Sequence, residues 1–283
     1  MPMLIPSEVP LTQRAFDFLA NLVYQRSHIR LGADKHTLVA GRLRQRLQSL
    51  GLEDYDDYCE LLKSPGSADE IDALIDLIST NHTHFFRENS HFETLSRHIL
   101  PTLASRAQAL IRPLQVWCAA ASSGEEVYSL AIVLAEFCHS RPSLLWNIEA
   151  SDISHRMLQR CQQGIYEAQK VELPSPEWLN RYFQLGFGDR DGFLRVKAEL
   201  RRRVSVQYIN LFQDSYPIPE AQDLIFCRNV MIYFDTHSRS LLLEKLTAHL
   251  APGGYLFVGH SESLIGIRHS LKPVWPSIYM RPE

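Results

Sequence analysis

One stretch of the chain decides the fold: Val116-Trp117-Cys118-Ala119-Ala120-Ala121-Ser122-Ser123-Gly124-Glu125-Glu126. Its apolar start predicts a buried parallel strand over 114–121, and a helix expected over 125–137 begins directly after the small residues. Small residues let a ligand approach the backbone, and the free N–H groups of a helix start can hold a polar cofactor. The stretch lacks G-x-G-x-x-G, and its two glutamates would repel phosphates but suit an ammonium and a sulfonium. It therefore favours S-adenosylmethionine over a dinucleotide, with an ordinary tight turn and a capping glutamate as the alternative.

Strand and helix patterns alternate on the C-terminal side of this stretch. We expect strands over 146–150, 223–227 and 255–259, and helices over 154–163 and 238–250. Such alternation predicts a mostly parallel, Rossmann-like sheet with helices on both faces and right-handed crossovers. One segment departs from it. The turn-rich stretch Gly186–Gly192 lies between 179–185 and 193–196, is followed by 204–209, and predicts a small antiparallel insertion.

Helical patterns fill the first third of the chain. Apolar residues recur at near-helical spacing over 11–24, 37–50 and 71–78, and no strand pattern precedes residue 80. A chain of 283 residues favours two domains over one. We therefore predict an α/β protein with an all-α N-terminal domain over 1–80 and a cofactor-binding domain over 81–283. The antiparallel β-subdomain is expected as an insertion at about 179–209.

The composition is that of an ordinary globular protein, with 45% hydrophobic and 22% charged residues. A formal net charge of −3 provides no global positive field for phosphates, so no nucleic-acid partner is expected. The five cysteines are widely separated and odd in number, which suits reduced thiols in the cytosol. No leader and no apolar run of the roughly 18 residues needed for a membrane span is present, so a cytoplasmic location without membrane insertion is expected.

The segment Asn81–Asn89 joins the two predicted domains and holds adjacent phenylalanines between polar residues, which is unusual for a plain linker. His84 lies in this segment, and His91 and His98 follow it at intervals of seven residues. Metal-binding histidine pairs on helices are three or four residues apart, so no metal site is expected.

Polar side chains follow the expected strands at the carboxyl edge of the sheet. Asp152 ends one strand, where an acid can accept both ribose hydroxyls or cap the next helix. Arg228, Asn229 and Tyr233 follow another strand, where polar groups usually face a site. In the alternative, Arg228 pairs with a structural carboxylate and Tyr233 caps the core. Asn210-Leu211 follows a third strand and could contact an adenine, although asparagine is as often a turn former.

Four motifs occur in order along the chain. They are Asn81-x-Thr83-x-Phe85-Phe86-Arg87, Ala119-Ala120-Ala121-Ser122-Ser123-Gly124-Glu125-Glu126, Cys227-Arg228-Asn229-Val230-Met231-Ile232-Tyr233-Phe234 and Gly259-His260-Ser261-Glu262-Ser263. Together they resemble the CheR family of chemotaxis-receptor glutamate methyltransferases, over about residues 10 to 280. The resemblance implies methyl transfer from S-adenosylmethionine to glutamate side chains on the cytoplasmic helices of bacterial chemoreceptors. It also implies a set of cofactor contacts, with Glu126 favoured over Glu125: Asn81, Thr83, Arg87, Glu125 or Glu126, Asp152, Asn210, Leu211, Arg228 and Asn229.

The chemistry of such a reaction assigns two catalytic residues. A glutamate carboxylate, with a pKa near 4.3, is already the anion at neutral pH, so no general base is needed. The barrier is instead lowered by holding the carboxylate oxygen, methyl and sulfur in line. We assign Arg87 to a carboxylate of cofactor or substrate, and Tyr233 to the sulfonium or the attacking carboxylate.

The N-terminal helices resemble the family's substrate-docking domain, where a basic helix faces acidic receptor helices. The candidates are Lys35, Arg42, Arg44 and Arg46, although a solvated surface explains such charges equally well. On an ideal helix Arg44 points away from Arg42 and Arg46. The insertion resembles the family's β-subdomain, which in some members binds a C-terminal receptor pentapeptide as an added strand, whereas a plain hairpin predicts the same glycines.

Two rival functions remain at this point. A dehydrogenase or other nucleotide-binding enzyme is disfavoured by the missing G-x-G-x-x-G and by the Glu125-Glu126 pair. A non-catalytic receptor- or scaffold-binding module that retains the fold is disfavoured by four intact residues: Arg87, Asp152, Asn229 and Tyr233. Binding of S-adenosylhomocysteine but not of NAD separates the methyltransferase from the first rival.

Overall fold

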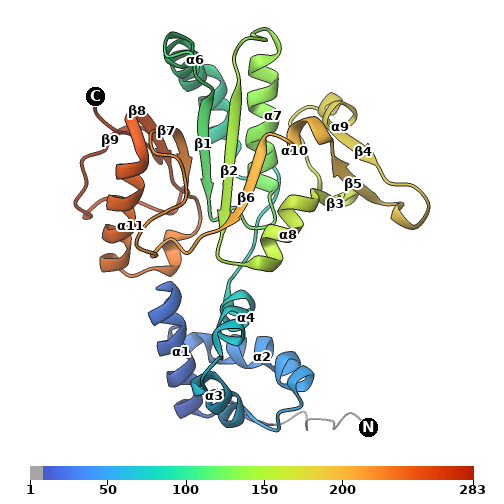
Figure 1. Cartoon of the computed structure of the whole chain (residues 1–283), viewed down its shortest axis with the longest axis vertical. Coiled ribbons are helices and arrows are strands. Elements are labelled where there is room, and N and C mark those ends of the chain that lie inside the picture. The colour runs from blue at the N-terminus through green and yellow to red at the C-terminus, as the bar shows by residue number, and fades with distance from the viewer. Residues whose placement is uncertain (1–8) are drawn as a thin grey trace. The chain divides into compact units, whose positions relative to one another are not determined.

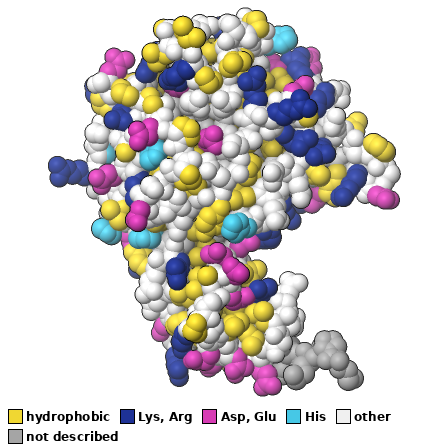
Figure 2. Space-filling model, in the orientation of Figure 1, with side chains coloured by type: hydrophobic (Ala, Val, Ile, Leu, Met, Phe, Trp, Pro, Cys, Tyr) yellow, Lys and Arg dark blue, Asp and Glu magenta, His cyan; other side chains and the backbone are white. Residues whose placement is uncertain are grey.

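The computed structural model describes residues 9–283, drawn as a cartoon in Figure 1. The chain forms two compact units. The first holds the chain up to Thr80 together with Tyr233–Asp235, and the second holds Asn81–Ile232 and Thr236–Glu283. Over 9–283, no helix is long and apolar enough to cross a membrane. Both acidic and basic side chains occur on the face seen in Figure 2.

The described part of the first unit is built of helices. They are α1 (Gln13–Ser27), the short η1 (Ala33–Lys35), α2 (His36–Leu50), α3 (Tyr55–Lys63) and α4 (Ala68–Ile78). Local residues set their ends. The Thr12 hydroxyl accepts a backbone N–H of the first turn of α1, and α2 stops at Gly51, whose φ of 69° is left-handed. Val39, Leu43 and Leu47 form a buried stripe along α2, because they recur at helical spacing.

A seven-stranded sheet lies at the centre of the described second unit, in the order β6-β2-β1-β7-β8-β10-β9 (Figure 1). Its strands are β1 (Leu114–Ala119), β2 (Trp146–Asp152), β6 (Val204–Tyr208), β7 (Gln222–Phe226), β8 (Leu250–Phe257), β9 (Lys272–Trp275) and β10 (Ile278–Met280). The first five in this order run parallel, and β10 and β9 follow in antiparallel pairing. β7 is buried along its whole length, as a central parallel strand should be.

Helices cover both faces of this sheet. They are α5 (Ser90–Thr94), the π-helical turn η2 (Leu95–Ile99), α6 (Leu100–Ala109), α7 (Glu125–His139), α8 (His155–Gln163) and α11 (Thr236–His249). Side chains alternate along β1. Val116 and Cys118 join a core cluster with residues of α5, α6 and α7, whereas Trp117 packs against Tyr216 and against His249 of α11. Adjacent residues of one strand therefore contribute to two apolar layers.

A small antiparallel sheet in the order β3-β5-β4 is separate from the main sheet. Its strands are β3 (Ile165–Glu167), β4 (Phe183–Leu185) and β5 (Phe193–Val196). Short helices connect and follow these strands: η3 (Ala168–Lys170), α9 (Glu177–Tyr182), η4 (Gly188–Arg190) and α10 (Ala198–Arg201). We call this segment the β-subdomain.

The predicted bounds of the insertion, about 179–209, are wrong at both ends. The β-subdomain already begins with β3, and most of the expected strand over 179–185 is helix α9. The strand expected over 204–209 is β6 of the main sheet, where Val204 pairs with Ile148 and Val206 with Ala150 in parallel register. Strands of three to five residues are too short for their pattern to show which sheet they join.

Candidate active site

The turn between β1 and α7 has an unusual backbone conformation. Ala120, Ser122 and Gly124 all have positive φ, at 62°, 48° and 97°. A Cβ on Gly124 would lie 2.7 Å from Cys161 Sγ and 2.9 Å from the Tyr166 hydroxyl, so only glycine fits without a shift. Left-handed residues other than glycine are uncommon and concentrate at functional sites. The turn is therefore a candidate part of such a site.

Asp152 ends β2 and is bonded to this turn. Its carboxylate accepts a hydrogen bond from Ser122 N at 2.8 Å and another from Ser154 N at 2.9 Å. The side chain that caps α8 is Ser154, whose hydroxyl accepts from Met157 N at 3.1 Å. Ser154, and not Asp152, therefore caps α8. The Asp152 carboxylate is held at the carboxyl edge of the sheet.

The Arg228 guanidinium is the centre of an ion-pair network. Its Nη2 lies 2.7 Å from Glu88 Oε2 and its Nη1 lies 2.7 Å from Glu126 Oε2, with no part of the arginine side chain exposed. Arg228 also donates to the Arg87 carbonyl oxygen at 2.6 Å. Burial alone would raise the pKa of Glu88, but the hydrogen bond and charge of Arg228 outweigh burial and lower that pKa to about 2. The structure thus shows the alternative in which Arg228 pairs with carboxylates.

Asn229 is held by Glu262, a carboxylate to which the sequence analysis assigned no role. The buried Glu262 accepts N–H groups from Asn229 at 2.7 Å, Gly259 at 2.6 Å and Ile232 at 3.3 Å. Asn229 has a left-handed φ of 57°, and its Nδ2 donates to Glu88 Oε1 at 3.2 Å. Burial raises the pKa of Glu262, against the lowering effect of its N–H donors. Glu262 therefore connects the loop after β7 to the loop after β8. Its position in the Gly-His-Ser-Glu-Ser motif is the feature of the sequence from which a role could have been predicted.

Other predicted cofactor residues neighbour this network along the chain. Ser123 Oγ donates to Glu125 Oε2 at 2.7 Å, and burial raises the pKa of Glu125. Arg87 donates through Nη1 to a backbone carbonyl, that of His82, at 2.7 Å. Asn81 and Thr83 are half-buried in the segment that leads to Arg87.

The predicted adenine contact lies at the end of β6. Ile209 N donates to the Asp152 carbonyl oxygen at 3.1 Å, which places the segment that follows beside the end of β2. Asn210 Oδ1 accepts from Phe212 N at 3.0 Å, as a turn-forming asparagine does, and Leu211 is buried. Asn210 therefore forms a turn at the sheet edge where a cofactor contact was expected.

Tyr233 ends the short 3₁₀ segment η5 (Met231–Tyr233) and groups with the helical unit. There its carbonyl oxygen accepts a hydrogen bond from Arg30 N at 3.0 Å. In the same unit the Tyr24 hydroxyl donates to Asp235 Oδ2 at 2.5 Å. Tyr233 thus belongs to a segment that is part of the helical unit in space but distant from it in sequence.

Two of the three predicted docking arginines are bound within the helical unit. Arg42 Nη1 donates to the carbonyl oxygens of Ile78 and, at 3.1 Å, of Ser79, at the end of α4. Arg46 forms a bidentate pair with Glu70 of α4, with Nε 3.0 Å from Oε1. Arg42 and Arg46 therefore tie α2 to α4, whereas Arg44 is exposed.

The residues at the sheet edge fit the chemistry of S-adenosylmethionine. Carboxylates outnumber guanidinium groups in these segments, which suits a cofactor whose ammonium and sulfonium outnumber its one carboxylate. The buried Ser122 hydroxyl has no hydrogen-bond partner among the described residues, so it is available to a polar ligand. The charged side chains are Glu88, Glu125, Glu126, Asp152, Arg87 and Arg228.

Comparison with known proteins identifies the family. Residues 14–79 match the all-alpha domain of CheR methyltransferase, and residues 81–279 match its SAM binding domain. The chain belongs to the CheR methyltransferase family. It is 40% identical to the chemotaxis protein methyltransferase of Salmonella typhimurium over 253 residues, which cover 89% of this chain and 85% of the relative. It is also 38% identical to chemotaxis protein methyltransferase 2 of Pseudomonas aeruginosa, with 96% and 94% covered, and 36% identical to the Borreliella burgdorferi protein, with 96% of each covered.

This CheR-family chain is therefore an S-adenosylmethionine-dependent methyltransferase. The predicted family, the cofactor, and the α/β fold with an all-α domain and a small antiparallel sheet are confirmed. Nothing in the comparisons favours the non-catalytic binding module.

Proposed function

We propose that this CheR-family methyltransferase esterifies glutamate side chains on the cytoplasmic helices of chemoreceptors, for adaptation in chemotaxis or a related chemosensory pathway. The observation that supports it best is the network of Glu88, Arg228 and Glu126 at the sheet edge of the S-adenosylmethionine-binding domain. The names of its relatives, chemotaxis protein methyltransferases, point to the same substrate class. The products are glutamate methyl esters and S-adenosylhomocysteine, formed in the cytoplasm where those receptor helices lie.

The chemistry requires positioning more than proton transfer. Bound S-adenosylmethionine supplies the electrophilic methyl group. Above its pKa near 4.3 a substrate glutamate is already the nucleophile. Arg228 pairs with Glu88 and Glu126, and backbone N–H groups bind Glu262, so these carboxylates shape the site instead of acting as bases. The protein then has to hold the reacting atoms in line.

Arg87 and Tyr233 are the residues to which we assign direct roles. Arg87 neutralises a carboxylate of cofactor or substrate through its guanidinium group. Tyr233 approaches the sulfonium or the attacking carboxylate with its ring face or hydroxyl. In the same proposal Asp152 accepts the ribose hydroxyls, and either Glu125 or Glu126 accepts the ammonium. The remaining cofactor contacts come from Asn81, Thr83, Asn210, Leu211, Arg228 and Asn229.

We assign contact with acidic receptor helices to the exposed Arg44 of α2. The bonds of Arg42 and Arg46 to α4 fix the helix that carries it. Lys35 ends η1, directly before α2. Its Nζ lies 3.0 Å from Asp34 Oδ2, so part of the charge of Lys35 is compensated. In this proposal Arg42 and Arg46 hold α2 against α4, and Arg44 contacts the receptor.

The β-subdomain offers a place for a receptor tail. Both outer strands, β3 and β4, keep one edge without a strand partner among the described residues. Leu185 and Phe187, at and after the end of β4, are 69% and 88% exposed. An extended C-terminal pentapeptide can add to such an edge through main-chain hydrogen bonds, with its side chains against these apolar groups.

The decisive experiment is transfer of labelled methyl from S-adenosylmethionine to receptor fragments with and without their C-terminal tails. We expect base-labile methyl esters on glutamates, formed faster when the tail is present. Absence of label on every fragment, with S-adenosylhomocysteine still bound, would refute carboxylate transfer and leave a binding module. Equal rates with and without the tail would refute tethering. If Arg87→Ala and Tyr233→Phe both kept the wild-type kcat/KM, their assigned roles would be withdrawn.

A further inference from the structure

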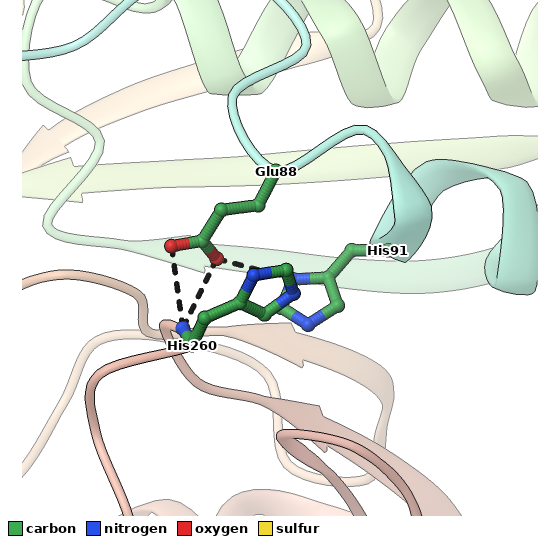
Figure 3. A group of neighbouring side chains, drawn as sticks. All are labelled: Glu88, His91 and His260. Carbon is green, nitrogen blue, oxygen red and sulfur yellow. Dashed lines mark hydrogen bonds and ion pairs between the residues drawn. The ribbon is translucent and has the colours of Figure 1, made fainter.

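Three potential metal ligands from distant parts of the sequence meet in the second unit (Figure 3). Glu88 precedes α5, His91 lies in α5, and His260 follows β8. One ligand atom from each lies within 4.8 Å of the other two, and His91 Nδ1 is 3.6 Å from Glu88 Oε2. The rings of His91 and His260 are 4.5 Å apart between centroids and inclined at 78°. The predicted absence of a metal site rested on the spacing of His84, His91 and His98, which does not include His260.

His91 is buried without satisfying its polar atoms. Its exposure is 2%, and neither ring nitrogen makes a hydrogen bond of good geometry to a described residue. A buried polar group left unpaired destabilises the folded state, so such a group in a native protein requires an explanation. Metal coordination provides one, because a neutral imidazole offers its free lone pair to a cation.

Packing fixes the orientation of the His91 ring. The ring makes an edge contact with Phe257 at 5.6 Å between centroids.

Glu88 is oriented as a metal-ligating carboxylate usually is, by hydrogen bonds from outer groups. Arg228 Nη2 donates to Oε2 at 2.7 Å, Asn229 Nδ2 donates to Oε1 at 3.2 Å, and His260 N is 3.2 Å from both oxygens. Arg228 does not leave an uncompensated positive charge beside the cluster, because it pairs with Glu126 as well as with Glu88. The exposed His260 gives an ion a route from solvent.

We propose that Glu88, His91 and His260 bind one divalent transition-metal ion of the zinc class, with water in the fourth position. Two imidazole nitrogens and one carboxylate oxygen are a donor set that zinc takes in proteins, and one that magnesium and calcium do not favour. The ion would connect α5 to the loop after β8 and share Glu88 with Arg228. This inference does not depend on the receptor substrate, since the binding test below needs neither cofactor nor receptor.

Calorimetric titration of the metal-free full chain with Zn²⁺ tests the proposal. We expect one ion per chain, bound at least about 100-fold more weakly by His260→Ala, because loss of even an outer-shell partner costs roughly 10- to 100-fold in metal affinity. His91→Phe, which keeps a ring beside Phe257, should lose binding likewise. His98→Ala removes an exposed histidine outside the cluster and should bind as the wild type does.

Equal Zn²⁺ affinity of the wild type and His260→Ala would overturn the proposal, as would a wild type that binds no ion. Cobalt replaces zinc as a spectroscopic probe of the ligands. We expect visible d–d bands of a nitrogen and oxygen site that disappear in His260→Ala. A strong thiolate charge-transfer band would instead place the ion on a cysteine and would also overturn the proposal.

Discussion

Replacing Arg228 by methionine tests whether its network holds the sheet edge together. Methionine approximates the length of the arginine side chain but carries no charge. In this variant Glu88 and Glu126 remain without the guanidinium group with which both pair. The arginine side chain is fully buried, and the two carboxylate side chains are 16% and 12% exposed. Breaking a buried ion pair by removing one partner costs about 3–5 kcal/mol, and we expect a loss of unfolding free energy in this range at pH 7.

The dependence of this loss on pH follows from Glu88. In the wild type its pKa is lowered from 4.5 to about 2, so its stabilising contribution is complete above pH 4.5 and is lost as the pH falls toward 2. Without Arg228, burial raises the pKa of Glu88, opposed only by the hydrogen bonds from Asn229 and His260. A raised carboxyl pKa destabilises the folded state at neutral pH, and protonation relieves that cost. The deficit of Arg228→Met should therefore shrink between pH 7 and pH 5.

Urea unfolding followed by circular dichroism at these two pH values measures both effects. The matched control is Arg97→Met, which replaces an exposed arginine of the same unit and should stay within about 0.5 kcal/mol of the wild type. A deficit of Arg228→Met below about 1 kcal/mol at pH 7 would refute the reasoning. So would a deficit of the same size at both pH values.

Four further substitutions test separate parts of the structure. Gly124→Ala places a Cβ against Cys161 at a φ of 97°, so thermal unfolding should show a loss of about 1–3 kcal/mol; an unchanged Tm would contradict the close contact. Arg42→Ala should lower the unfolding free energy by about 1–3 kcal/mol, because it removes the donor to carbonyl oxygens at the end of α4. Arg44→Ala should leave that free energy unchanged but reduce receptor methylation and flatten its salt dependence, and no effect on methylation would exclude it from docking. Asp152→Asn should weaken S-adenosylhomocysteine binding about 10-fold in calorimetry, and wild-type affinity would exclude the ribose contact.

Local patterns were sufficient to predict the main architecture. The apolar run that starts at Leu114 and the small residues up to Gly124 form a strand, a turn and a helix start within a dozen residues, so no distant partner is needed to recognise them. The same holds for β7, whose apolar residues precede Arg228. The β-subdomain was predicted with wrong bounds because β3 and β4 contain only three residues each, fewer than a repeating pattern requires.

The polar network could not be derived in the same way. Glu88 and Arg228 are 140 residues apart, and Asn229 and Glu262 are 33 apart, so each pair meets only after the sheet has formed. The motifs containing these residues were visible in the sequence, but their pairing was not. Likewise, the periodicity of α2 placed Arg42 and Arg46 beside its apolar stripe without showing that α4 supplies their partners.

The segment Tyr233–Asp235 makes the helical unit discontinuous along the gene. A fragment that ends at Thr80 lacks the acceptor for Arg30 N and the acceptor for the Tyr24 hydroxyl, both of which come from this segment. The N-terminal helices alone are therefore not a complete unit that can be exchanged between relatives. A chimaera that exchanges the N-terminal helices should carry the donor's residues at 233–235 as well, although they lie in the other half of the coding sequence.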